Sequence, residues 1–86
     1  MNTENIMKIV EKVIEMGCSR EHYASLSLSM SPNTFPVSVN IHNLDSKGLP
    51  AGLADRKFFY NVDTCEVHRD WLNHWVDRIR EEREND

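Results

Sequence analysis

The sequence predicts an α+β domain in which a helix, an antiparallel meander of three or four strands and a second helix follow one another. Two observations carry this prediction. Two neighbouring segments alternate apolar and polar residues, and two flanking segments repeat apolar residues every three to four positions. The first pattern is typical of half-buried strands and the second of amphipathic helices. A sheet with one apolar face needs a cover, so we expect both helices to pack on that face.

Length and charge predict a small protein of one domain. The 86 residues, with a net charge of -4, fit one domain over residues 1–80, followed by a charged tail over residues 81–86 that we expect to fray. No apolar run approaches the ~18 residues of a membrane span, and Glu4 interrupts what would be a signal peptide. We therefore expect a cytoplasmic protein, in which the two cysteines stay reduced.

The first predicted helix precedes the strands. Lysines and glutamates occupy its other side, Asn2 or Thr3 can cap its start, and Gly17 can end it in a left-handed conformation. Its apolar stripe is Ile6, Ile9, Val10, Val13 and Ile14.

The hairpin follows, with a break at residues 32–34. Serines, Asn40 and His42 separate its apolar residues and should form a polar face. The apolar residues are Ala24, Leu26, Leu28 and Met30 in the first strand, and Phe35, Val37, Val39 and Ile41 in the second.

Beyond the hairpin the pattern weakens. Residues 45–48 predict a tight turn, and residues 49–56 a loop that Leu49 and Leu53 attach to the core. Residues 57–62 predict a third strand, and residues 66–68 a short fourth strand. In the alternative interpretation the last helix starts at Asp63, with Glu66 completing a capping box.

The last predicted helix carries the largest apolar side chains. We expect Asp70 to cap it, and the helical pattern to end before Glu81. Its stripe is Trp71, Leu72, Trp75, Val76 and Ile79.

The order of elements resembles that of double-stranded RNA-binding domains, but only in topology. Such domains bring a lysine cluster to the start of the last helix, where this chain has Arg69 and Asp70. The acidic balance also disfavours a phosphate backbone as the main partner. Weak nucleic-acid binding through Arg56, Lys57 and Arg69 is therefore an alternative function only.

A second alternative is a zinc-stabilised binding module. Cys18 and His22 lie four positions apart, Cys65 and His68 three, and thiolate and imidazole are the ligands of tetrahedral zinc. Isolated cysteines and histidines of this kind are more often without metal. We expect no cofactor and no metal.

Catalytic patterns are weaker. Cys18 with His22, or a serine near His42 with Asp45, supplies the residue types of a triad. Serines on an alternating strand are, however, what a solvated face requires, and no glycine-rich phosphate loop precedes a helix. The sequence predicts a protein without catalytic activity.

The remaining function is interaction. A flat polar face with isolated aromatic residues suits a protein partner, and strands without internal charges suit pairing with a second copy. We expect a small protein-interaction or regulatory module, as a homodimer. The predicted interaction surface comprises Tyr23, Ser25, Ser27, Ser29, Ser38, Asn40, His42 and Phe59.

Overall fold

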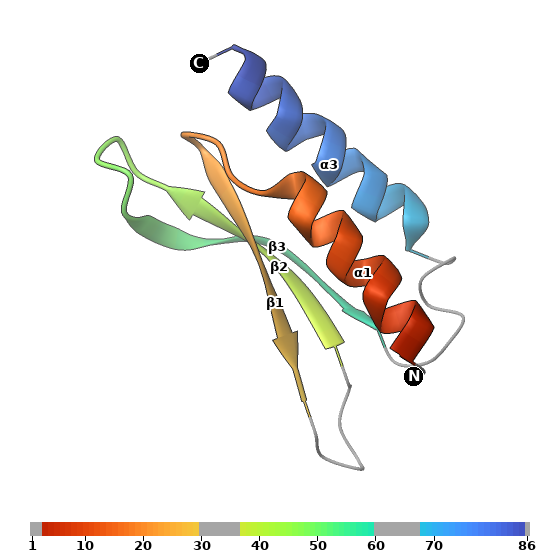
Figure 1. The fold of residues 1–86 in the computed structure, drawn as a ribbon. Coiled ribbons are helices and arrows are strands. Elements are labelled where there is room, and N and C mark those ends of the chain that lie inside the picture. The colour runs from red at the N-terminus through yellow and green to blue at the C-terminus, as the bar shows by residue number, and fades with distance from the viewer. Residues whose placement is uncertain (1–2, 30–36, 60–67, 86) are drawn as a thin grey trace.

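The computed structural model describes residues 3–29, 37–59 and 68–85, and within them the predicted α+β architecture is confirmed. Three antiparallel strands form one sheet in the order β1-β2-β3, and the two helices lie side by side on one face of it (Figure 1). The elements are α1 (Thr3–Met16), β1 (His22–Leu28), β2 (Val37–Leu44), β3 (Pro50–Phe59) and α3 (Arg69–Glu84).

The alternating pattern of the hairpin sets its register. Tyr23 lies opposite His42 and Ser27 opposite Ser38, so the polar residues of both strands share one face. On the other face, β2 buries Val37, Val39 and Ile41, and Ala24 and Leu26 of β1 pack against this core. The prediction of one apolar and one polar face is confirmed for the described strands.

The core lies between this apolar face and the helices. Each large side chain that is fully buried there contributes about 1.5–3 kcal/mol. Both helices and two strands supply its buried residues, which are Ile9, Met16, Val37, Val39, Ile41, Phe59, Leu72, Trp75, Val76 and Ile79.

The C-terminal end of α1 is closed from two sides. Gly17 adopts the left-handed conformation, with φ of +58°, and its N–H donates to the carbonyl of Val13 over 3.0 Å. The guanidinium of Arg83, on α3, donates to the carbonyl oxygens of Met16 and Glu15. A cation at this end of a helix complements the helix dipole, so Arg83 attaches α3 to α1.

The strand β3 corrects the prediction of a loop over residues 49–56. β3 begins at Pro50, which an edge strand tolerates, and its pairing with β2 shifts register on either side of His42. Gly52 lies in this irregular part, with φ of +101°. Leu49 and Leu53 are exposed, so the prediction that they attach a loop to the core is wrong.

One carboxylate connects β3 to α3. Asp55 lies opposite Ile41, and its Oδ2 accepts hydrogen bonds from Nε1 of Trp71 over 2.8 Å and of Trp75 over 3.1 Å. Burial opposes ionisation of Asp55, but the two indole N–H groups, the N–H of Arg56 and the charge of Lys57 outweigh it. The pKa of Asp55 consequently lies below its ordinary value.

Both ends of α3 differ from the predictions. The helix starts directly after His68, which makes no side-chain capping hydrogen bond, and Asp70 lies in the first turn instead of at the cap. It continues to Glu84, so the prediction of fraying from Glu81 onward is wrong. Within the predicted fourth strand, residues 66 and 67 lie outside the described residues, as do Asp63 and residues 60–62 of the predicted third strand.

Candidate functional site

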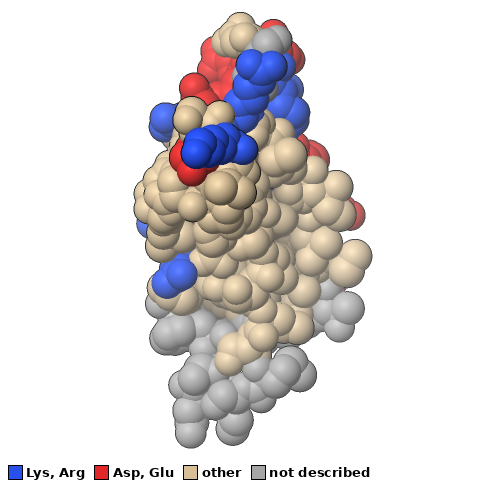
Figure 2. All heavy atoms as spheres, turned by 90° about the vertical axis from the view of Figure 1, so that its left-hand side faces the viewer, with Lys and Arg blue, Asp and Glu red and all other residues tan. Residues whose placement is uncertain are grey.

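The face of the sheet opposite the helices is the first candidate site, and we call it the open face. Figure 2 shows it as a broad area with few charged side chains, while most charges gather near one end of the molecule. Its residues are Tyr23, Ser25 and Ser27 from β1, Ser38, Asn40 and His42 from β2, and Leu53, Arg56 and Phe58 from β3.

A first group on the open face is built around His42. The imidazole stacks on the ring of Tyr23, with centroids 4.4 Å apart and an interplanar angle of 11°. Its Nε2 lies 2.8 Å from Oγ of Ser25. Tyr23 and His42 are directly paired across β1 and β2, and Ser25 lies two positions further along β1 on the same face. The sheet therefore holds the three side chains in place.

A second group crosses all three strands. Arg56 donates from Nε to Oδ1 of Asn40 over 2.6 Å, and Nδ2 of Asn40 donates to Oγ of Ser27 over 3.4 Å. Asn40 is only 3% exposed, although it lies on the open face. The guanidinium carbon of Arg56 also lies 5.8 Å from the ring centroid of Phe58. These contacts orient a cation and an aromatic ring toward the surface.

Phe59 is not part of this surface. It pairs with Val37 and is fully buried in the core, so the prediction that it lies on the interaction surface is wrong. Its neighbour Phe58, 37% exposed, takes the place on the open face because consecutive residues of a strand point to opposite faces. Ser29 follows the end of β1 and is half-buried.

The Ser25 and His42 pair has the spacing of a nucleophile and a base, but not the rest of a catalytic site. Asp45, which would orient the base, accepts hydrogen bonds from the N–H groups of Lys47 and Leu49 within its own turn. The other predicted pair does not form, since His22 is turned toward Glu82 while Cys18 is exposed.

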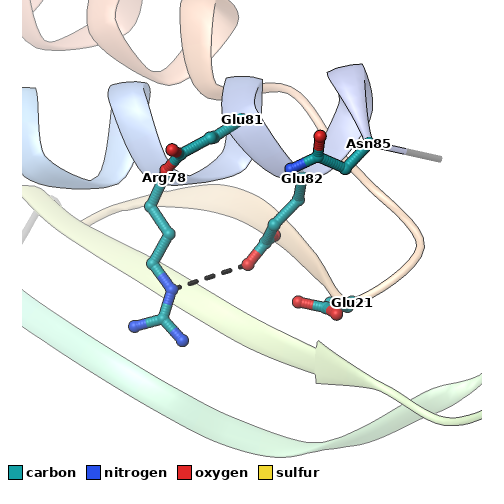
Figure 3. Close-up of a pocket in the computed structure, with 5 residues that line it drawn as sticks. All are labelled: Glu21, Arg78, Glu81, Glu82 and Asn85. Atoms are coloured by element: carbon teal, nitrogen blue, oxygen red, sulfur yellow. Dashed lines mark ion pairs between the residues drawn. The ribbon is translucent and has the colours of Figure 1, made fainter.

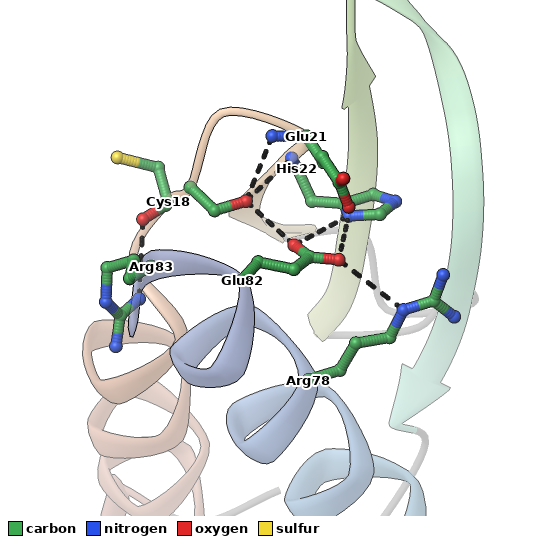
Figure 4. Close-up of polar contacts among 7 residues, drawn as sticks. Cys18, Glu21, His22, Arg78, Glu82 and Arg83 are labelled. Carbon is green, nitrogen blue, oxygen red and sulfur yellow. Dashed lines mark hydrogen bonds and ion pairs between the residues drawn. The ribbon is translucent and has the colours of Figure 1, made fainter. Parts of the chain in front are cut away.

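A second cluster joins the start of β1 to the end of α3, and we call it the Glu82 cluster (Figure 4). The carboxylate of Glu82 lies 2.9 Å from Nδ1 of His22 and accepts from Oγ of Ser19 over 2.7 Å. Nε of Arg78, one helical turn earlier, lies 3.5 Å from Glu82. Burial opposes the ionisation of Glu82, but the hydrogen bonds from His22 and Ser19 hold its pKa below the ordinary value.

A shallow surface pocket of about 340 Å³ adjoins the Glu82 cluster (Figure 3). Its lining is polar, with Glu21 and Glu81 beside the ion pair of Arg78 and Glu82. A site for a small organic ligand would require apolar walls, which this pocket lacks.

No family model, curated protein or solved structure matches this chain. Among the described residues, no helix is both long and apolar enough to span a membrane. The function must therefore be inferred from the geometry of the chain itself.

The residues of the predicted zinc site are not brought together. His22 lies beside Glu82 at the end of α3, while His68 directly precedes α3, fourteen positions earlier. A helix rises about 1.5 Å per residue, so the two imidazoles lie at opposite ends of an axis of about 20 Å. Cys65 lies outside the described residues. Four-ligand zinc binding is incompatible with this separation.

A different group of ligand atoms lies close together within the described part of the chain. Oxygens of Glu21 and Glu82 and a nitrogen of His22 are all within 4.8 Å of one another. Glu82 already bonds His22, Ser19 and Arg78, so its charge is balanced without an ion.

The basic residues of the nucleic-acid alternative do not form one surface. Arg56 and Lys57 are consecutive in β3, and their side chains leave the sheet on opposite faces. Arg69 begins α3, in the helix layer. A phosphate backbone needs several cations along one face, which these three positions do not provide.

Sequence reasoning missed Asp55, Phe58, Glu82 and Arg83, and it named Arg56 only as a possible nucleic-acid contact, not as part of the open face. A signal existed for two of them. Leu72, Val76 and Ile79 follow the three-and-four spacing of one helical side, and the same spacing continues to Glu82 and Arg83. Their polar side chains lie on the core-facing side of α3 and contact β1 and α1 there.

Proposed function

We propose that the protein is a small cytoplasmic interaction module without catalytic activity, which binds a partner protein through the open face. The observation that carries this proposal is the combination of residues there. Tyr23, Arg56 and Phe58 project from a rigid sheet, with hydroxyl and amide groups between them and no acidic side chain among the residues of the open face.

The aromatic residues and arginine of the open face are those that protein interfaces favour. Interfaces are enriched in aromatic residues and arginine and depleted in lysine and acidic residues, and tyrosine and arginine recur among the residues that dominate binding energy. The open face is one surface of a three-stranded sheet, so an extended protein surface fits it better than a small molecule does.

Arg56 indicates the chemistry of the partner. Its Nε is used on Asn40, which fixes the plane of the guanidinium. The two terminal amino groups of a guanidinium can then donate in parallel to one carboxylate. The partner should therefore present an aspartate or glutamate flanked by apolar side chains that cover Phe58 and Tyr23.

The test is capture of partners from the native cell with three immobilised forms of the protein. The wild type is compared with Arg56→Ala and with Arg80→Ala, a matched control on the exposed side of α3. A protein retained by the wild type and the control, but lost with Arg56→Ala, supports the proposal. This partner, once purified, should bind Arg56→Ala at least about tenfold more weakly than it binds the wild type, which corresponds to about 1.4 kcal/mol.

Tyr23→Ala provides a second variant from another strand. If all forms retain the same proteins with equal yield, the open face does not carry the interaction. Far-UV circular dichroism of each variant shows whether the fold is intact, so that lost binding is not confused with unfolding.

A further inference from the structure

The two edges of the sheet are unequal. β3 carries Pro50, a glycine in an irregular stretch, and the charges of Asp55, Arg56 and Lys57, which are devices that prevent strand pairing. β1 contains no lysine, arginine, aspartate or glutamate, and its seven residues pair regularly with β2. β1 is therefore the edge at which another strand can be added.

Hydrogen bonds define which part of β1 is available. The N–H of Ala24 donates to the carbonyl of Gly17 over 3.1 Å, so the backbone groups of Ala24 point away from β2. The direction of the backbone N–H and C=O groups alternates from one residue to the next along a strand. The groups of Leu26 and Leu28 therefore also point away from β2. In the described part of the chain, no backbone group is bonded to them on that side. The bridge between Cys18 and Tyr23 occupies the edge only at the start of β1.

We infer that β1 pairs antiparallel with β1 of a second copy, with the twofold axis at Ser27. In this register each Leu26 lies opposite Leu28 of the other copy, and the two residues exchange both backbone hydrogen bonds. The four N–H and C=O groups that point outward on each copy are thereby satisfied by four intermolecular bonds. An axis at Leu26 would instead require the N–H of Ala24, which Gly17 already uses.

The side chains fit the same register. Leu28 is 53% exposed in the single chain, on the helix-facing side of the sheet, and the second copy places Leu26 beside it. A twofold axis perpendicular to the sheet also keeps both α1 helices on one face. α1 contacts β1, and it carries the exposed residues Met7 and Ile14, seven positions apart on one side of the helix.

Cross-linking tests the register directly. In a background of Cys18→Ser and Cys65→Ser, Ser27→Cys places one thiol of each copy at the axis. The two residues at position 27 lie opposite each other and form no backbone hydrogen bonds with one another. There the Cα atoms lie about 4.5 Å apart, within the range of a disulfide. Oxidised glutathione should convert this variant to a disulfide-linked dimer of twice the 10.1 kDa chain mass. Ser25→Cys, two residues away on the same face, should stay monomeric because its counterpart lies about 13 Å along the strands.

Sedimentation tests the association without a covalent bond. Ser27→Lys places two ammonium groups at the axis and should weaken the dimer about fivefold or more, whereas Ser46→Lys, in the exposed turn between β2 and β3, should leave the dissociation constant unchanged. A wild-type chain that sediments as a monomer at every concentration overturns the proposal. So does equal cross-linking of Ser25→Cys and Ser27→Cys, which would indicate random encounter. Loss of the open-face partner affects neither readout.

Discussion

Replacing Asp55 by alanine tests how β3 is attached to α3. The change removes the acceptor of two indole N–H groups, at 2.8 Å from Trp71 and 3.1 Å from Trp75. A hydrogen bond to a charged group contributes about 1.5–3 kcal/mol. Trp75 is only 5% exposed, so its N–H finds no water in exchange, while half-buried Trp71 regains part of its loss. We expect Asp55→Ala to lower the free energy of unfolding by about 2–4 kcal/mol.

Urea denaturation followed by far-UV circular dichroism measures this loss without depending on the tryptophan environment. Asp77→Ala is the matched control, because Asp77 is exposed on α3 and pairs only with Arg80 among the described residues. It should change stability by less than about 0.5 kcal/mol. If Asp55→Ala falls within the same limit, the two indole bonds do not stabilise the fold and the reasoning is refuted.

Three further predictions concern the core, the Glu82 cluster and metal. Trp75→Ala should cost about 3–5 kcal/mol, measured as a shift of the urea midpoint, and an unchanged midpoint would place the indole outside the core. Because the pKa of Glu82 lies below its ordinary value of 4.5, its contribution is complete above that pH and is lost as the pH falls through the lower folded value. Glu82→Gln should therefore flatten acid denaturation, which equal pH profiles would contradict. Chelators should leave the melting temperature unchanged, and one equivalent of zinc by elemental analysis would reverse the expectation of no metal.

The hairpin was predictable because each of its strands has one buried face and one exposed face. One face of β1 and β2 is covered by helices and the other is open, so apolar and polar residues alternate. The amphipathic helices follow from the same reasoning, with a period of 3.6.

The part of β3 that the sequence analysis missed has no buried face. Residues 51–54 are exposed on both faces, and burial alternates only from Asp55 to Phe59. Where neither face of a strand is buried, apolar and polar residues need not alternate, so the sequence shows no strand pattern. Phe58 and Phe59 are equally apolar, so only the register with Val37 determines which of them enters the core.

The contacts at the end of α3 escaped prediction for another reason. Glu82 and Arg83 resemble residues of a solvated tail, since their composition is polar. Their function in the fold depends on partners about sixty positions earlier, at Met16 and His22, which no local pattern reveals.

The position of α3 in the chain has a consequence for synthesis. Leu72, Trp75, Val76 and Ile79 cover the sheet, yet all of them leave the ribosome after the three strands. Until then the apolar face of the hairpin has only α1 against it, next to the unprotected edge of β1. The nascent chain thus combines exposed apolar residues with a free strand edge, the two features that promote aggregation of incomplete chains. The interval before α3 emerges is when this protein would most depend on a chaperone.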